Sequence, residues 1–346
     1  MDGRGRPVSR QPLRAVAALR GLETDRVPVA PLLGAVSARL AGIDVCDAYR
    51  DVALQTRAQA AAVDAFEPDL IFPFMDLTAE PEALGARVSW RPGSGPEVCG
   101  MLQPEQLLMA LERCEVHGAR LPVYSQVVGA LSQSVGHTCA VGAYVSGPWT
   151  LVSSALGLAG AARLMRRDPD MAGRLAQLAA GFARELAREA VDAGAVVIMI
   201  LEPCVAGGIL SPADFGTVVR PGILQLAQSI RRNGAEPVLH VCGDTGPVLS
   251  GLADLGGLAL SVDHPTPLGR VLEAAGPDTP IMGNLDPVNT LMRGTPEQVT
   301  AACRGCLPAA AGSKQFILAT GCEVPLLSPP ETLRAMCRSV VESPSL

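Results

Sequence analysis

Three residues have the types and the spacing of a metal site. His240 and Cys242 are separated by one residue at the end of an apolar run, and Cys322 follows another such run. Residues two apart on a β-strand point to the same face, so the imidazole and the first thiol are expected to project together. One His and two Cys leave a fourth position free, as in catalytic zinc sites. The residues alone leave a second interpretation open, in which all three are buried core residues.

Two carboxylates follow other expected strands and are candidates for the same site. Asp76 comes after the run at 70–74, and Glu202 comes after the run at 195–201. Both are expected to line the pocket. Glu202 has two open interpretations: a fourth zinc ligand or substrate-positioning group, or a carboxylate that accepts hydrogen bonds from loop amides.

The loops after the next strands carry further polar residues. Asp263 and His264 either orient His240 from behind, as partners of metal-bound histidines commonly do, or belong to a loop that caps the next helix. Asn284 and Asp286 are expected to form a turn that caps the following helix through Asp286.

Short apolar runs of strand length alternate with segments of helical period, which indicates a parallel α/β protein. The eight runs lie at 27–31, 70–74, 140–145, 195–201, 237–241, 258–262, 280–283 and 315–319. Asp168-Pro169, Ser211-Pro212 and Thr295-Pro296 are typical starts of helices. Eight strands, each followed by a helix and with no linker between them, predict a single (β/α)8 TIM barrel. Residues 1–25 are expected to be an N-terminal extension and 26–346 one barrel domain.

An insert is expected at about 78–139, between the second and third strands. It contains a predicted hairpin at 87–92 and helices near 104–117 and 124–135. A long insert at this place is typical of a lid over the mouth of the barrel.

Composition limits the functions that are open to the chain. The net charge of −6 argues against a nucleic-acid partner. Ten cysteines in 346 residues without a regular framework indicate reduced thiols and a cytoplasmic protein. The stretch 121–162 has no Asp, Glu, Lys or Arg, but Pro122 and Pro148 interrupt it, so no membrane span is expected.

Several motifs resemble the uroporphyrinogen decarboxylase superfamily, and within it the cobalamin-dependent methyltransferase branch that includes methylcobamide:coenzyme M methyltransferases. The motifs are VLHVCGDTGPVL at 238–249, IMGNLDPVNTLMRGTPEQV at 281–299 and FILATGCEVPLLSPPETLRAM at 316–336, together with VSGPWTLVSSALG at 145–157 and ILEPCVAGGILSPADF at 200–215. In that branch the H-x-C pair and the later G-C bind zinc. The resemblance therefore implies that His240, Cys242 and Cys322 hold Zn²⁺, whereas Asp76 matches the position of the decarboxylases' essential aspartate.

The resemblance implies a zinc-dependent methyltransferase that moves a methyl group between a corrinoid and a thiol activated as a zinc thiolate. The chain has no D-x-H-x-x-G corrinoid-anchoring motif, so methylcobalamin is expected to arrive free or on a separate corrinoid protein. Two alternatives use the same fold: demethylation of a methoxy or methylamine donor, and a metal-free decarboxylase-like lyase that depends on Asp76. A third alternative is a non-catalytic protein that keeps the fold and carries a corrinoid or a metal. A homodimer is compatible with the superfamily.

Overall fold

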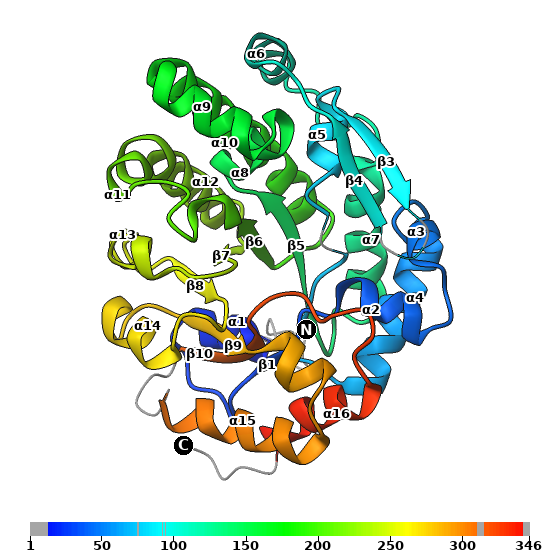
Figure 1. The fold of residues 1–346 in the computed structure, drawn as a ribbon. Coiled ribbons are helices and arrows are strands. Elements are labelled where there is room, and N and C mark those ends of the chain that lie inside the picture. Colours follow the sequence, from blue (N-terminus) through cyan, green and yellow to red (C-terminus); the bar gives the residue numbers. More distant parts are fainter. Residues whose placement is uncertain (1–12, 75, 92, 94, 310–314, 342–346) are drawn as a thin grey trace, which may run out of the picture.

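Eight parallel strands form a nearly closed barrel in the computed structural model, which describes residues 13–341 except 75, 92, 94 and 310–314 (Figure 1). Their order around the barrel is β1-β10-β9-β8-β7-β6-β5-β2. The bounds are β1 Val29–Ala30, β2 Leu70–Ile71, β5 Ala140–Ser146, β6 Val197–Leu201, β7 Glu236–Val241, β8 Ala259–Val262, β9 Ile281–Leu285 and β10 Phe316–Thr320. The N–H of Asp69, just before β2, donates to the carbonyl of Val29 in β1 at 2.8 Å, which joins the two ends of this strand order. The predicted TIM barrel and all eight expected strands are confirmed.

Helices cover the outside of the barrel. Their bounds are α1 Arg14–Leu19, α2 Gly34–Leu40, α3 Val45–Ala48, α4 Val52–Phe66, α5 Ala79–Ala83, α6 Pro104–Arg113, α7 Leu121–Ser134, α8 Pro148–Leu156, α9 Leu158–Arg167, α10 Pro169–Asp192, α11 Pro212–Asp214, α12 Arg220–Arg232, α13 Leu249–Ala253, α14 Leu268–Ala275, α15 Pro296–Ala309 and α16 Pro330–Ser339. None of those in the described ranges is long and apolar enough to cross a membrane.

The strands are apolar on both faces because both faces are covered. All five residues of β6, Val197–Leu201, are buried. Along this strand Met199 packs inside the barrel while Ile198 and Ile200 pack against the surrounding helices. Burial on both faces explains why the sequence shows continuous apolar runs instead of strict alternation.

Helix starts follow the signals in the sequence. The carboxylate of Asp168 accepts from the N–H of Met171 at 3.0 Å at the start of α10. The hydroxyl of Ser211 accepts from the N–H of Asp214 at 3.1 Å at the start of α11. Each side chain satisfies an N–H that has no partner within the first turn of its helix.

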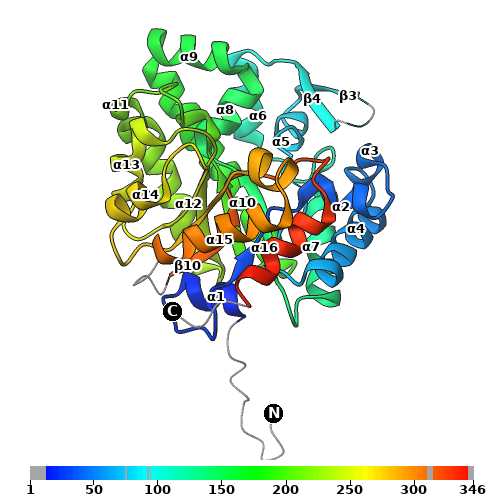
Figure 2. The same ribbon diagram turned by 60° about the horizontal axis from the view of Figure 1, so that its bottom comes forward.

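The two ends of the barrel are covered by different segments. Helix α1 closes the amino-terminal end, where Val16 and Leu19 pack with the first residues of strands such as Val197 and Ala259. At the other end, β3 (Arg87–Arg91) and β4 (Gly95–Gly100) form an antiparallel hairpin. Figure 2 shows the hairpin and α1 on opposite sides of the molecule. A hairpin is therefore present at the expected place but is longer than predicted, because the expected range of 87–92 covers only β3 and the whole of β4 lies beyond it.

The hairpin is attached to the barrel through Trp90. The guanidinium of Arg50 lies 3.6 Å from the centre of the Trp90 ring, and that of Arg120 lies 4.8 Å from it. The insert also contributes α7, which packs on α4 and β5 as part of the outer helical layer.

Candidate metal centre

The carboxyl ends of strands β7 and β10 bring His240, Cys242 and Cys322 together. His240 is in β7, Cys242 follows the end of β7, and Cys322 follows β10. One ligand atom from each residue lies within 4.8 Å of the other two. The Sγ atoms of Cys242 and Cys322 are 3.3 Å apart. The expected cluster thus forms at the carboxyl ends of the strands, where barrel enzymes place their active sites.

His240 is held in a way that suits a metal ligand. Its side chain is buried, and its Nδ1 lies 3.0 Å from the hydroxyl of Ser261 on β8. Its Nε2 is also buried and has no hydrogen-bond partner among the described residues. A buried ring nitrogen without a partner is costly unless something binds it. The orphaned Nε2 and the two adjacent sulfurs fit a zinc ion, which prefers nitrogen and sulfur donors.

The two thiols affect each other's ionisation. Contact with the S–H of Cys242 lowers the pKa of Cys322, and the nearby His240 lowers it further against the effect of burial. The pKa of Cys242 is raised in turn by Cys322 and by burial. One proton is therefore lost readily from the pair and the second is retained, as expected for two thiols in contact.

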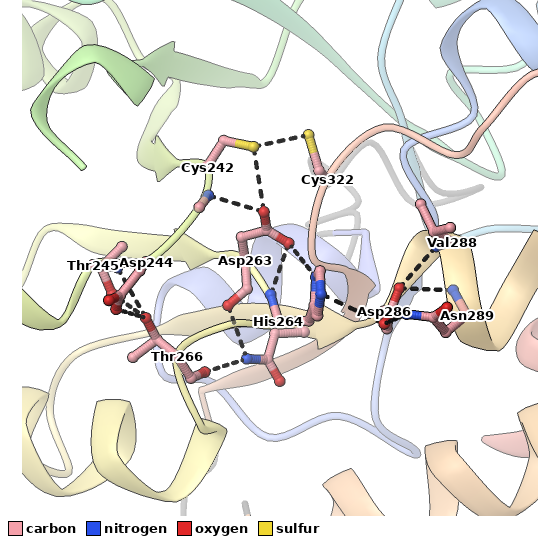
Figure 3. A network of polar contacts seen from close by, with 12 residues as sticks. Cys242, Asp244, Thr245, Asp263, His264, Thr266, Asp286, Val288, Asn289 and Cys322 are labelled. Atoms are coloured by element: carbon pink, nitrogen blue, oxygen red, sulfur yellow. Dashed lines mark hydrogen bonds and ion pairs between the residues drawn. The ribbon is translucent and has the colours of Figure 1, made fainter. Parts of the chain in front are cut away.

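Asp263 contacts Cys242 and not His240. Its Oδ2 accepts from the thiol of Cys242 at 3.3 Å and from the N–H of Gly243 at 2.8 Å (Figure 3). Burial alone would raise the pKa of Asp263, but hydrogen bonds from Gly243 and His264 hold it below its ordinary value. Of the two interpretations from the sequence, orientation of His240 does not match these contacts, because Asp263 lies beyond the end of β8, beside Cys242, and the Nδ1 of His240 is instead close to Ser261.

His264 connects this carboxylate to a second one. Its Nδ1 is 2.9 Å from Asp263 Oδ1, and its Nε2 is 3.4 Å from Asp286 Oδ2. Asp286 accepts from the N–H groups of Val288 and Asn289 at 2.8 and 2.9 Å, so its predicted capping role is confirmed. Asn284 has a different role from the expected turn: its side-chain amide donates to the carbonyls of Asp263 and Thr266, which fixes the loop after β8.

Glu202 accepts hydrogen bonds from the backbone of α8, the helix that follows the neighbouring strand β5. It is fully buried, and its carboxylate accepts from the N–H groups of Trp149 and Thr150 and from the Thr150 hydroxyl, at 2.6 to 3.1 Å. Burial raises its pKa to about 7 against these bonds. Of the two interpretations from the sequence, the contacts match the carboxylate that binds loop amides, here at the start of α8.

Asp76 lies in a polar cluster supplied by the insert. It accepts from Arg120, from the hydroxyl of Tyr124, and from the N–H and hydroxyl of Thr78. Arg120 also donates to Glu82 at 2.7 Å. Nothing in the sequence pattern pointed to Arg120 or Tyr124, because their position relative to Asp76 depends on how the insert folds back on the barrel.

The molecule is thus a parallel (β/α)8 barrel with a candidate metal centre of one His and two Cys at the carboxyl ends of its strands. Residues 11–343 match the model of the uroporphyrinogen decarboxylase (URO-D) family. The chain therefore belongs to that family.

Its relatives carry two kinds of name. A methylated-thiol–coenzyme M methyltransferase of Methanosarcina mazei is 27% identical over 96% of this chain and 89% of its own. A methylcobamide:CoM methyltransferase of Methanosarcina barkeri is 24% identical over 93% and 95%. A uroporphyrinogen decarboxylase of a Synechococcus strain is 26% identical over 73% and 72%. The solved structure of a methyltransferase from Methanosarcina mazei superimposes with a TM-score of 0.86 at 25% identity, covering 94% and 96%.

Proposed function

We propose that this protein is a zinc-dependent methyltransferase that moves a methyl group between a corrinoid and a thiol. The observation that carries the proposal is the cluster of two sulfurs and one orphaned imidazole nitrogen at the carboxyl end of the barrel. The names of the two Methanosarcina relatives, which cover nearly the whole chain, support it.

His240, Cys242 and Cys322 would hold the zinc ion. Zinc bound there would keep a thiol substrate deprotonated at neutral pH, which makes it a nucleophile. Two thiolate ligands and a neutral imidazole bring the charge of the site to about zero, so the substrate sulfur stays electron-rich. Ser261 holds the His240 ring in position, and Asp263 holds the Cys242 thiol.

In the proposed reaction the methyl group passes from the methyl corrinoid to the thiol substrate. The thiolate sulfur forms a bond to the methyl carbon with its own electron pair. The carbon–cobalt bond of the methyl-Co(III) corrinoid breaks with both electrons remaining on cobalt, which becomes Co(I). The thiol proton goes to solvent. The corrinoid is expected to reach the carboxyl end of the barrel free or on a separate protein.

The test is an absorbance assay with purified, zinc-loaded protein, methylcobalamin and a panel of small thiols. Loss of the methylcobalamin spectrum and formation of the thioether are expected with at least one thiol. A metal-free protein that releases CO2 from a porphyrinogen would contradict the proposal in favour of a lyase using Asp76. Methylation of Co(I) corrinoid by methoxy or methylamine donors alone would contradict the thiol assignment. A preparation that binds methylcobalamin and zinc without turnover would contradict the assignment as an enzyme.

A further inference from the structure

A cavity of about 60 Å³ lies beside the carboxyl ends of β2 and β5, against α5, α7 and α10. Its polar lining consists of Asp76, Glu80, Tyr124, Tyr144 and Glu189, besides the hydroxyl of Ser125. A water molecule needs only about 10–15 Å³ on this measure, so a small polar group fits. The lining includes three carboxylates and no Lys or Arg.

Glu80, which lines the cavity, and Ser146, which is hydrogen-bonded to Glu80, each have an oxygen atom without a partner. Glu80 is 6% exposed, and its Oε1 accepts from the N–H of Ser146 at 2.8 Å. Its Oε2 is buried without a hydrogen-bond partner in the described part of the chain, as is the hydroxyl oxygen of Ser146. Burial raises the pKa of Glu80 to about 7 against the opposing effect of Ser146, and the charge of Asp76 adds to the effect of burial. Such groups are stabilised by a ligand that donates hydrogen bonds.

Two arginines near this end of the barrel, Arg120 and Arg39, already have acceptors. Arg120 donates to Asp76, Glu82, Thr78 and the hydroxyl of Tyr124. Arg39 donates to the carbonyls of Leu326 and Ser328. An anionic substrate tail would therefore meet carboxylates here, whereas a cationic tail would meet free acceptors.

Ser146, to which Glu80 is hydrogen-bonded, lies at the same level of the barrel as the metal centre. Ser146 pairs in register with Leu201, which pairs with His240, so the three lie at one level of the barrel. Two strand spacings separate the backbones of Ser146 and His240 by about 10 Å. Tyr144 points to the same face as Ser146, two residues along the strand, and packs with side chains inside the barrel such as Met199.

We propose that Glu80 and Ser146 bind a protonated amine at the far end of the second substrate, which makes that substrate a small amine-bearing thiol. This assignment rests on the proposed function, because it places the sulfur of the same molecule at His240, Cys242 and Cys322. It differs from the coenzyme M named for the relatives, whose tail is a sulfonate.

Three two-carbon thiols that differ only in their tails test this proposal: cysteamine (ammonium), 2-mercaptoethanol (hydroxyl) and coenzyme M (sulfonate). With zinc-loaded protein and methylcobalamin, kcat/KM is expected to be highest for cysteamine and lowest for coenzyme M. In Glu80→Gln the advantage of cysteamine over 2-mercaptoethanol should fall about tenfold, the scale of one hydrogen bond to a charged group. Ser146→Ala should reduce it in the same direction. Glu112→Gln, on the exposed face of α6, should keep the wild-type order.

A binding measurement separates this proposal from the proposed function. Calorimetric titration with 2-(methylthio)ethylamine, which has no thiol to ionise, is expected to show about tenfold weaker binding to Glu80→Gln than to wild type. Coenzyme M as the best substrate, or an unchanged order in Glu80→Gln, would overturn the amine assignment and leave the methyltransferase intact. No turnover with any thiol would count against the methyltransferase, while the titration would still decide whether Glu80 binds an amine.

Discussion

At the scale of single residues, the centre depends on how the His240 ring is oriented. A hydrogen on Nδ1 that donates to the hydroxyl of Ser261 leaves the lone pair of Nε2 free for a metal. Cys242 is fixed in a similar way by Asp263, which is itself held by Gly243 and His264. The ligands are therefore positioned by groups from the neighbouring strand β8 and the loop after it.

Removing the partner of His240 should weaken metal binding without unfolding the barrel. Ser261→Ala is expected to lower zinc affinity about 10–100-fold, the usual effect of losing such a partner. Competition with a chromophoric chelator measures it. The control is Ser250→Ala on α13, where the side chain is exposed. Equal affinities in wild type and Ser261→Ala would show that Ser261 does not orient the ligand.

Glu80 should make stability depend on pH. Its pKa is raised from 4.5 to about 7 by burial, so the folded protein holds this proton more tightly than the unfolded chain does. The stabilisation from the protonated group is complete below pH 4.5 and is lost as the pH rises through about 7.

Glu80→Gln lacks this titration, so its thermal midpoint should rise relative to wild type between pH 5 and pH 8. Differential scanning calorimetry of both proteins across that range gives the difference between their thermal midpoints at each pH. The contributions of the other titrating groups are the same in both proteins and cancel in this difference. A difference that stays constant with pH would show that Glu80 does not titrate in this window.

At the scale of elements, the sequence predicts the barrel strands better than the insert. Each parallel strand is buried on both faces, so it appears in the sequence as an apolar run bounded by turns. The two-residue period of a strand also predicted that His240 and Cys242 would point the same way. Arg120, Tyr124 and Glu80 belong to the insert, and no periodicity shows where an insert folds back. Ser261 was missed because a serine within a strand has no distinguishing pattern.

Helix α1 should contribute to stability as the closure of the amino-terminal end. Leu19 is 8% exposed and packs with the first residues of the strands. Leu19→Ala is expected to cost about 2 kcal/mol or more. Leu22→Ala, three residues later and 46% exposed, should change the free energy of unfolding by at most about 0.5 kcal/mol. Chemical denaturation of the two variants compares them directly, and equal effects would mean that α1 is not a structural part of the barrel.

At the scale of the whole molecule, the two ends of the barrel have different roles. One end is closed by α1, and the other carries the three candidate ligands, the cavity with Glu80 and the hairpin fixed through Trp90. This division is typical of TIM-barrel enzymes, in which the amino-terminal end stabilises and the carboxyl end reacts. The sequence could predict which end holds the site, because polar residues follow the strands. It could not predict the cavity, which forms only where the insert meets β5.

The most direct test of the metal centre is the metal content of the purified protein, measured by mass spectrometry beside Cys242→Ala and Cys322→Ala. About one zinc per chain is expected in wild type and in the control Cys99→Ala, whose side chain is exposed on the hairpin. Both ligand variants should lose the metal and keep the circular dichroism of the folded barrel. Wild-type protein that takes up no zinc on reconstitution, or variants that retain it fully, would contradict the assignment of His240, Cys242 and Cys322 as the ligands.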